Sequence, residues 1–413
     1  MYYAVDWVDR IDFTAIRKYR SQNLQEEIRE HGLEALLCFR AENIRYMTGM
    51  RPLWWPISFI TRNAAIMAQT GPPVLYVTSG DAARCRLTMK WLPEGNIRPC
   101  ATMEDPGIVK TMVQREFLPA LRQMGVMEGR IGIDAATTAI FQELKNALPK
   151  AEWVDGDQCV KDAAAIKHPE EIKCMHLSVQ MADVAMEKAM RRIGTGVREC
   201  EVLATAMHTL YSFGMEVPQC SLIVASGENT APLHRFASDK PIQRGDLVFM
   251  DLGGCFNGYF SDFTRTVCLG QPNEQQKRIY TAVYETMMNI VETMKPGATN
   301  EQVNRSARGV IKKYGFEEYG FHGLLGHSIG VSGLTAPLIG ELAATGEKVF
   351  ELKPGMIFSL EPTIIVPGVP GGGGIRLENN ILITEKGNEV LNKTPYCQKM
   401  LGKGSCDGPC CVR

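Results

Sequence analysis

The sequence lacks the features that mark nucleic-acid-binding, membrane-spanning and secreted proteins. Its 413 residues include 45 basic and 46 acidic side chains, so the net charge is −1, and no basic arm or stripe is present. This balance argues against nucleic acid as a partner. No apolar run approaches the roughly 18 residues of a membrane span, and the acidic N-terminus lacks the apolar core of a signal peptide. We therefore expect a cytoplasmic protein.

The cysteines lack the paired spacing that is typical of zinc sites. Six of the thirteen occur singly in apolar or helical patterns, which predicts reduced, buried side chains: Cys38, Cys85, Cys159, Cys174, Cys220 and Cys268. Three others lie in the Gly-rich tail 401–413: Cys406, Cys410 and Cys411. No second Cys/His pair accompanies them, so we expect a disordered appendage, with a small metal site or a redox element as the alternative.

The chain length predicts two domains or one large one, and the pattern changes near residue 160. In residues 1–160, helical patterns alternate with short apolar strands, which predicts an α/β domain that ends in a turn at "EWVDGDQ". Residues 161–400 combine long amphipathic helices with pairs of strands, which predicts an α+β domain. Its first helix begins at Pro169, which is followed by two glutamates, a strong helix-start signal.

Residues 250–266, "MDLGGCFNGYFSDFTRT", place two aspartates on either side of a Gly- and Asn-rich turn. This pattern predicts a β-hairpin. With the turn centred on Phe256 and Asn257, Asp251 lies directly opposite Asp262; with the turn one residue further on, the two become diagonal neighbours. Either register places both carboxylates on one face, roughly 5–8 Å apart. Because like charges repel, we expect a positive charge between them.

Three further charged side chains stand in apolar or glycine-rich contexts: His327 in "GLLGHSIGVSG", Glu361 in "MIFSLEPTI" and Glu378 in "GIRLENNILI". A lone buried carboxylate costs several kcal/mol unless it is paired. Four carboxylates and one imidazole suit Mn, Fe, Co or Zn, and two such ions would neutralise the set and activate a water molecule. The alternative is that these are scattered surface charges on half-exposed strands.

These motifs resemble those of the pita-bread metalloenzymes, which include Xaa-Pro aminopeptidases, prolidases, methionine aminopeptidases and creatinase. The resemblance covers roughly residues 10–400 and includes the entry helix "IKHPEEIKCM". It implies a pseudo-twofold α+β catalytic domain behind a smaller α/β domain. It also implies metal ligands, of which Asp262 and Glu378 match the bridging ones: Asp251, Asp262, His327, Glu361 and Glu378.

The resemblance also implies two further histidines at the site. His234, in "VASGENTAPLHRF", precedes Asp251 by the interval that the family pattern expects and matches a proton shuttle or substrate clamp. Imidazole suits that role because its pKa lies near neutrality. His322, in "FHGLLGH", lies one position away from a family histidine and is a weaker candidate for the substrate pocket.

One departure from the family puts ordinary peptide cleavage in doubt. Where the peptidases have a second histidine and a glutamate before a proline, "GHSIGVSGLTAP" has Leu334 and Thr335. Creatinase, which hydrolyses a C–N bond of a metabolite without metal, and dimethylsulfoniopropionate lyases, which break a C–S bond, belong to the same family. All five ligands are present here, so a metal-free mechanism is not expected.

Three functions therefore remain open. The first is a dimetal hydrolase of an amide, imide or similar C–N bond in a small molecule such as an Xaa-Pro dipeptide, with Glu361 moving the proton and His234 stabilising the oxyanion. The second is a metal-dependent lyase of the dimethylsulfoniopropionate type. The third is a non-enzymatic binding module with a decayed site, which the intact ligand set disfavours.

The stretch "MRPLWWPISF" predicts a rigid aromatic loop, because Pro52 and Pro56 bracket Trp54 and Trp55. Neighbouring side chains of an extended segment point to opposite sides, so at least one tryptophan is available for a second surface. Members of the family commonly dimerise, which implies a homodimer with this loop over the partner's metal site and Arg51 on the substrate carboxylate. The alternative is local packing within the N-terminal domain.

Overall fold

The computed structural model describes residues 11–51, 61–218, 222–320 and 323–403. The chain forms two compact units, which meet in sequence between Ala164 and Ala165. The described residues contain no helix that is both long and apolar enough to cross a membrane.

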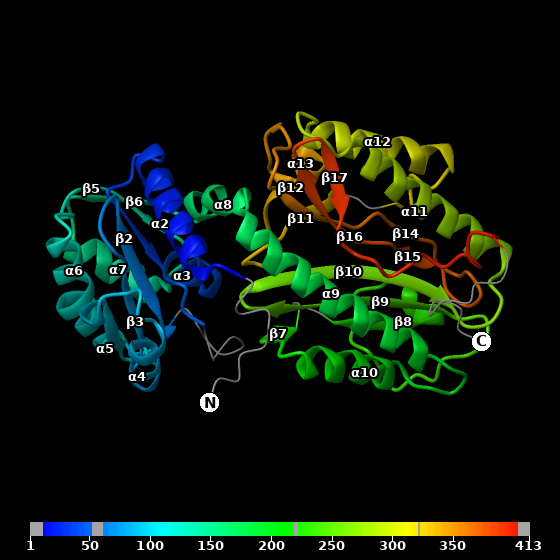
Figure 1. Cartoon of the computed structure of the whole chain (residues 1–413), viewed down its shortest axis with the longest axis horizontal. Coiled ribbons are helices and arrows are strands. Elements are labelled where there is room, and N and C mark those ends of the chain that lie inside the picture. Colours follow the sequence, from blue (N-terminus) through cyan, green and yellow to red (C-terminus); the bar gives the residue numbers. More distant parts are fainter. Residues whose placement is uncertain (1–10, 52–60, 219–221, 321–322, 404–413) are drawn as a thin grey trace. The chain divides into compact units, whose positions relative to one another are not determined.

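The N-terminal unit is built on one mixed six-stranded sheet in the order β4-β3-β2-β1-β5-β6. Its strands are β1 (Ala35–Cys38), β2 (Ala64–Ala68), β3 (Val74–Thr78), β4 (Ile97–Cys100), β5 (Gly129–Ile133) and β6 (Ala151–Asp155). Its helices are α2 (Phe13–Glu30), α3 (Ala41–Thr48), α4 (Ser79–Thr88), α5 (Pro106–Met112), α6 (Leu118–Gln123), α7 (Thr138–Ala147) and α8 (Asp157–Ala165), with a short 3₁₀ helix η2 (Glu94–Asn96) and a short π-helix η3 (Val113–Phe117). Helices cover both faces of the sheet (Figure 1).

One element of this unit was predicted wrongly. "EWVDGDQ" was expected to be a turn, but its first half belongs to β6, which pairs in parallel with β5, and its last residues begin α8. The Asp-Gly-Asp sequence is a strong turn signal. Strand β6 lies at the edge of the sheet and is only partly buried, so its own sequence carries little hydrophobic pattern. Pairing with β5 therefore decides its structure.

The C-terminal unit places two helix pairs against two antiparallel sheets. One pair is α9 (Pro169–Arg192) and α10 (Glu199–Ser212), against β7 (Val217–Pro218), β8 (Ile223–Ser226), β9 (Leu247–Phe256) and β10 (Tyr259–Cys268), with η4 (Gly227–Thr230) after β8. The other is α11 (Glu274–Thr293) and α12 (Asn300–Lys313), beside β11 (Leu324–Ser328), β12 (Thr335–Gly340), β13 (Ile357–Leu360), β16 (Asn379–Thr384) and β17 (Gly387–Val390). A two-stranded sheet, β14 (Thr363–Ile365) with β15 (Gly374–Arg376), and the short α13 (Leu342–Thr345) complete the unit.

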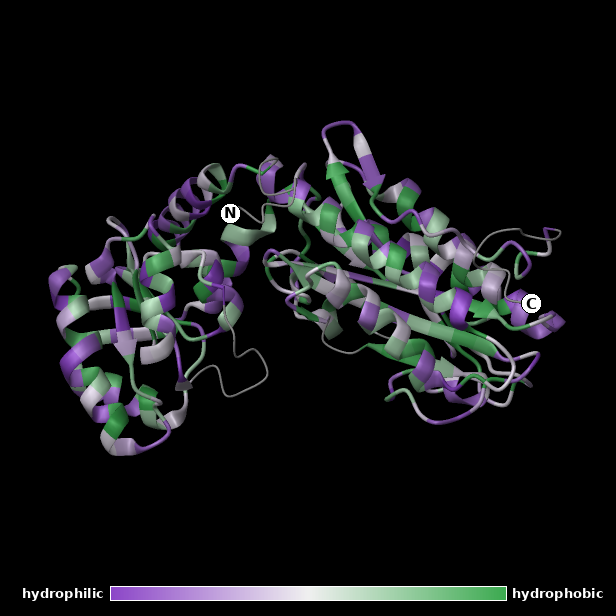
Figure 2. Ribbon diagram, turned by 60° about the horizontal axis from the view of Figure 1, so that its bottom comes forward, coloured by the Kyte–Doolittle hydropathy of each residue, from purple (hydrophilic) through white to green (hydrophobic). Residues whose placement is uncertain are grey.

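Helix α9 begins where the sequence predicts, and the reason is local. Pro169 occupies its first turn, and the His168 and Glu171 side chains bond reciprocally to backbone amides in a capping box. Its inner face is mostly apolar and packs on the β9–β10 hairpin. Figure 2 shows the same division, with hydrophobic residues on the strands and hydrophilic residues on the outer faces of the helices.

The β9–β10 hairpin adopts the second of the two predicted registers. Phe256 pairs with Tyr259, and the two turn residues between them have φ values of 51° and 83°, the left-handed conformation that Asn and Gly tolerate best. Asp251 therefore lies opposite Thr264, and Asp262 lies opposite Gly253. The two aspartates are diagonal neighbours on one face of the hairpin.

The described cysteines are free thiols. Five of the six predicted buried ones are buried: Cys38, Cys85, Cys159, Cys174 and Cys268. Cys220 and the three cysteines of the tail lie outside the described residues.

Candidate metal centre

Three sheets meet at the predicted ligands. Asp251 and Asp262 come from β9 and β10, and His327 comes from β11. Glu361 follows β13 directly, and Glu378 lies between β15 and β16. The two glutamates were expected inside apolar strands; they lie instead at strand junctions, where the chain passes from one sheet to another.

Three of the five ligands form a tight buried group. The donor atoms of Asp262, His327 and Glu378 all lie within 4.8 Å of one another. Two hydroxyls hold the Glu378 carboxylate: Thr264 Oγ1 donates to Oε2 at 2.7 Å and Ser359 Oγ donates to Oε1 at 2.7 Å. These bonds leave lone pairs of Glu378 available to a cation, because each carboxylate oxygen accepts more than one bond.

His327 is oriented to ligate through Nε2. Its Nδ1 lies 3.1 Å from the Ser328 carbonyl oxygen, which can only accept, so Nδ1 carries the proton and Nε2 carries the lone pair. Nε2 faces Asp262 Oδ2 at 3.7 Å and Glu361 Oε1 at 3.9 Å. Burial lowers the pKa of His327, which favours the neutral, ligating form.

The protein itself supplies a positive charge in this group, but the arginine that carries it contacts Asp251 and Glu361, whereas the sequence predicted a charge between Asp251 and Asp262. Arg376 Nη1 lies 3.0 Å from Asp251 Oδ2 and 3.0 Å from Glu361 Oε2. Its Nε donates to Thr363 Oγ1 at 2.9 Å, and the side chain is buried. Sequence analysis did not single out this arginine, although it lies two residues before Glu378. The sequence signal for a nearby cation was the repulsion between the aspartates. We expected metal ions alone to compensate this repulsion.

Two of the four carboxyl groups bind protons more tightly than usual, despite their contact with Arg376. Burial, together with the charge of Glu378, raises the pKa of Asp251 to about 7, against the opposing effect of Arg376. Burial likewise raises the pKa of Glu361 to about 8. Both carboxyl groups thus favour protons in the absence of other cations. The donor set of carboxylate oxygens and one oriented imidazole fits divalent metal ions.

His234 lies at the exposed rim of this group. Its Nε2 is 3.4 Å from Arg376 Nη2, and a guanidinium can only donate, so Nε2 is the acceptor in this contact. Burial and then the charge of Arg376 lower the pKa of His234, so the ring is neutral near pH 7.

The described structure does not test the roles of the predicted substrate-binding residues. His322, Trp54 and Trp55 lie outside the described residues. Arg51 is exposed and belongs to the N-terminal unit, where its carbonyl oxygen accepts a bond from Arg84 Nη2 at 2.9 Å. Their roles stay predictions.

The comparisons with known proteins agree with this arrangement. Residues 173–385 match the family model of metallopeptidase family M24, and residues 20–163 match the creatinase/prolidase N-terminal domain. An Xaa-Pro dipeptidase of Pyrococcus horikoshii is 33% identical over 380 residues, which are 92% of this chain and 98% of that protein. An Xaa-Pro dipeptidase of Pyrococcus furiosus is 38% identical over 265 residues, 64% of this chain and 74% of that protein.

Solved structures give the same result. The prolidase from Pyrococcus horikoshii OT3 superposes with a TM-score of 0.75 at 30% identity, over 91% of this chain and 99% of that one. An Xaa-Pro dipeptidase from Bacillus anthracis superposes with a TM-score of 0.76 at 27% identity, over 92% and 98% of the two chains. The expected pita-bread fold and creatinase-like N-terminal domain are thereby confirmed. The chain belongs to metallopeptidase family M24 and is a metal-dependent hydrolase of that family.

Proposed function

We propose that the protein hydrolyses the amide or imide bond of a small substrate, such as a dipeptide, at two divalent metal ions held by Asp251, Asp262, His327, Glu361 and Glu378. The observation that carries this proposal is the convergence of these five side chains from three sheets: Asp262, His327 and Glu378 form one tight group, His327 also faces Glu361, and Arg376 connects Glu361 to Asp251. Asp262 and Glu378 would contact both ions, as the family resemblance implies, and their donor atoms lie within 4.8 Å of each other and of His327.

The ions would supply the charge that polarises the scissile carbonyl and lowers the pKa of water. The residues of the chain would supply proton transfer and orientation. Glu361 is buried at the edge of the group, close to both His327 and Arg376, and would take a proton from the attacking water and pass it to the leaving nitrogen. His234, neutral at the rim, would donate a hydrogen bond to the carbonyl oxygen as it becomes negative.

Arg376 would act as a positioning residue. It binds Asp251 and Glu361 through the same nitrogen, so it fixes the separation of the two carboxylates. Thr363 and Arg376 belong to the paired strands β14 and β15, which makes the guanidinium part of a rigid hairpin.

The substrate class follows from the relatives and from one departure. The relatives named Xaa-Pro dipeptidase suggest a dipeptide with proline in second place. Leu334 stands where family peptidases carry a second histidine, and it is 53% exposed, so no imidazole is supplied from that position. We therefore propose that the substrate contains a C–N bond whose carbonyl group is held by one histidine fewer than in the family peptidases. Xaa-Pro dipeptides should accordingly be poor substrates.

A substrate panel in H₂¹⁸O tests the proposal. The purified protein is reconstituted separately with Mn, Fe, Co and Zn and assayed on Xaa-Pro dipeptides, other dipeptides, N-acylated small molecules and dimethylsulfoniopropionate. Hydrolysis incorporates one ¹⁸O atom into the product, whereas a lyase incorporates none. Metal-independent turnover, or no turnover of any C–N substrate with any of the four metals, would contradict the proposal.

We also propose a homodimer in which the loop carrying Trp54 and Trp55 lies beside the partner's metal ions, with Arg51 on the substrate. The mass in solution and the KM values of Trp54→Ala and Trp55→Ala test this. A monomer whose KM is unaffected by both changes would leave local packing as the role of the loop.

A further inference from the structure

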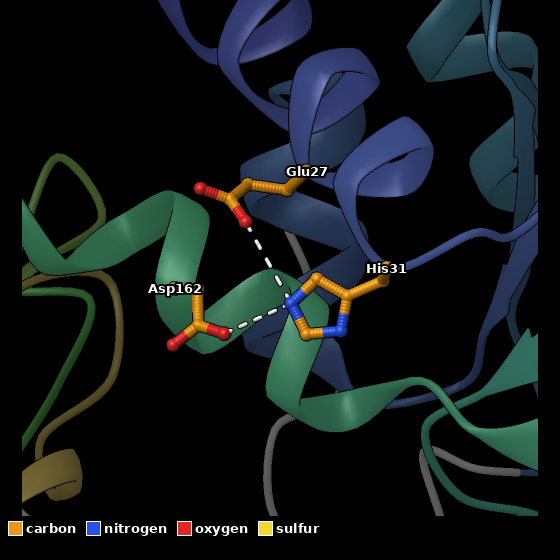
Figure 3. A group of neighbouring side chains, drawn as sticks. All are labelled: Glu27, His31 and Asp162. Atoms are coloured by element: carbon orange, nitrogen blue, oxygen red, sulfur yellow. Dashed lines mark hydrogen bonds and ion pairs between the residues drawn. The ribbon is translucent and has the colours of Figure 1, made fainter.

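A second group of metal-type donors lies in the N-terminal unit. Glu27 and His31 occupy successive turns at the C-terminal end of α2, and Asp162 lies on α8. His31 Nε2 is 3.0 Å from Asp162 Oδ2 and 3.6 Å from Glu27 Oε2. Figure 3 shows the imidazole nitrogen pointing toward both carboxylates, which approach it from two different helices.

The distances match those between ligands on one metal ion. Ligand atoms at about 2.0–2.2 Å from a zinc or similar ion lie roughly 3.0–3.6 Å from one another. The three donor atoms all lie within 4.8 Å of one another, and the side chains are between 21% and 42% exposed, which leaves room for water as a further ligand. One imidazole and two carboxylates suit borderline divalent ions.

The charge around the group also favours a cation. Among the described residues, the ion pairs of Glu27 and Asp162 are formed with His31 alone. Two carboxylates therefore face one imidazole, and the two like charges repel each other. A neutral His31 leaves this repulsion in place, and a protonated His31 offsets one of the negative charges. A divalent ion offsets two.

One neighbour holds a ligand in the necessary orientation. Gln158 Nε2 donates to Asp162 Oδ1 at 2.8 Å, which turns the other oxygen, Oδ2, toward His31. A hydrogen bond from an outer residue to a ligating carboxylate is a common feature of metal sites. Gln158 and Asp162 are four residues apart on α8, so the helix itself sets this geometry.

We propose that Glu27, His31 and Asp162 bind one divalent transition-metal ion, with Zn²⁺ as the reference ion, and that this ion links the end of α2 to α8. The site is separate from the proposed catalytic centre, whose ligands all lie in the C-terminal unit. Helix α8 leads directly into Ala165, the first residue of that unit. The ion would therefore fix the last helix of the N-terminal unit at the point where the chain leaves it.

The site can be removed without unfolding the unit, because α8 has other attachments. Asn23 Nδ2 donates to the Ala163 carbonyl at 2.6 Å, and Tyr46 Oη donates to the same oxygen at 2.7 Å. Cys159 and Val160 lie on the buried face of α8. These contacts do not involve the three proposed ligands.

Equilibrium dialysis of the full-length chain against Zn²⁺ tests the proposal, with bound zinc counted by elemental analysis. We expect His31→Gln to lose one zinc per chain relative to wild type and Gln158→Ala to bind that ion about 10–100-fold more weakly, the usual effect of an outer residue. His208→Gln, which removes an exposed histidine of α10, is the matched control and should bind as wild type does.

The same comparison in an Asp262→Asn background separates this site from the catalytic one. Loss of zinc caused by His31→Gln in both backgrounds supports the proposal, whatever the state of the catalytic ligands. Equal zinc content in His31→Gln and wild type would overturn it and leave an ion pair between a protonated histidine and two carboxylates. That result would not bear on the proposed hydrolase, which depends on the loss caused by Asp262→Asn.

Discussion

Replacement of Arg376 by methionine should destabilise the metal-free protein much more than the metal-loaded protein. In the metal-free state, Arg376 is the cation that contacts Asp251 and Glu361, each at 3.0 Å. Removing one partner of a buried ion pair costs ~3–5 kcal/mol, because the remaining charge is left without compensation. Both carboxyl groups can relieve part of this cost by binding protons, since their pKa values are already raised, so we expect the lower end of that range.

A loss of ~3 kcal/mol corresponds to a fall in Tm of roughly 6–12 °C for a domain of this size. In the metal-loaded protein, divalent ions would supply the positive charge that Arg376 supplies alone in their absence. The hydrogen bond to Thr363 is lost in both states and should account for about 0.5–1.5 kcal/mol in each. We therefore expect the metal-loaded variant to lose less than half as much stability as the metal-free one.

Calorimetric unfolding of wild type and Arg376→Met, each with chelator and with Mn²⁺, measures this difference. Arg376→Lys is the matched control, because it keeps the charge but loses the planar fork, and it should lie between the other two proteins. An equal Tm shift with and without metal would refute the reasoning, because it would show that Arg376 contributes through packing and not through charge. A metal-free variant as stable as wild type would refute it as well.

Four further outcomes follow from the same site. Asp262→Asn should lower the metal content and abolish turnover. A variant that keeps two tightly bound metal ions and the wild-type rate would contradict the ligand assignment. His234→Ala should keep the metals and reduce kcat by at least about 10²-fold. An unchanged kcat would show that His234 is a solvent-exposed loop residue without a catalytic role. Because Leu334 replaces a histidine of the family peptidases, kcat/KM for Xaa-Pro dipeptides should fall below about 10⁴ M⁻¹s⁻¹. A value as high as that of a prolidase would show that this replacement does not impair peptide cleavage. The pKa values of Asp251 and Glu361 are raised to about 7 and about 8, so these two groups together bind more protons in the folded metal-free protein than in the unfolded chain between pH ~4 and pH ~8. Its free energy of unfolding should therefore fall as pH rises from about 5 to 8, and saturating metal should remove this slope; a metal-free protein that gains stability over that range would contradict the assignment.

Much of the fold could be predicted because its signals are local. The Asn257-Gly258 pair specifies a tight turn through its left-handed φ values, and it thereby sets which residues of β9 and β10 face each other. Pro169 with its two following glutamates fixes the start of α9. Strand β6 was missed because its structure depends on pairing with β5 and not on its own residues.

The candidate ligands could be recognised from the sequence because a charged residue in an apolar context needs a partner, whatever the fold. The identity of that partner could not. Arg376 and Asp251 are 125 residues apart, and His31 and Asp162 are 131 residues apart, so each contact exists only after the strands and helices have packed. The sequence by itself determined which side chains must be compensated. The tertiary structure decided which groups compensate them, because side-chain charges interact strongly only at distances of a few ångströms, and packing alone sets those distances.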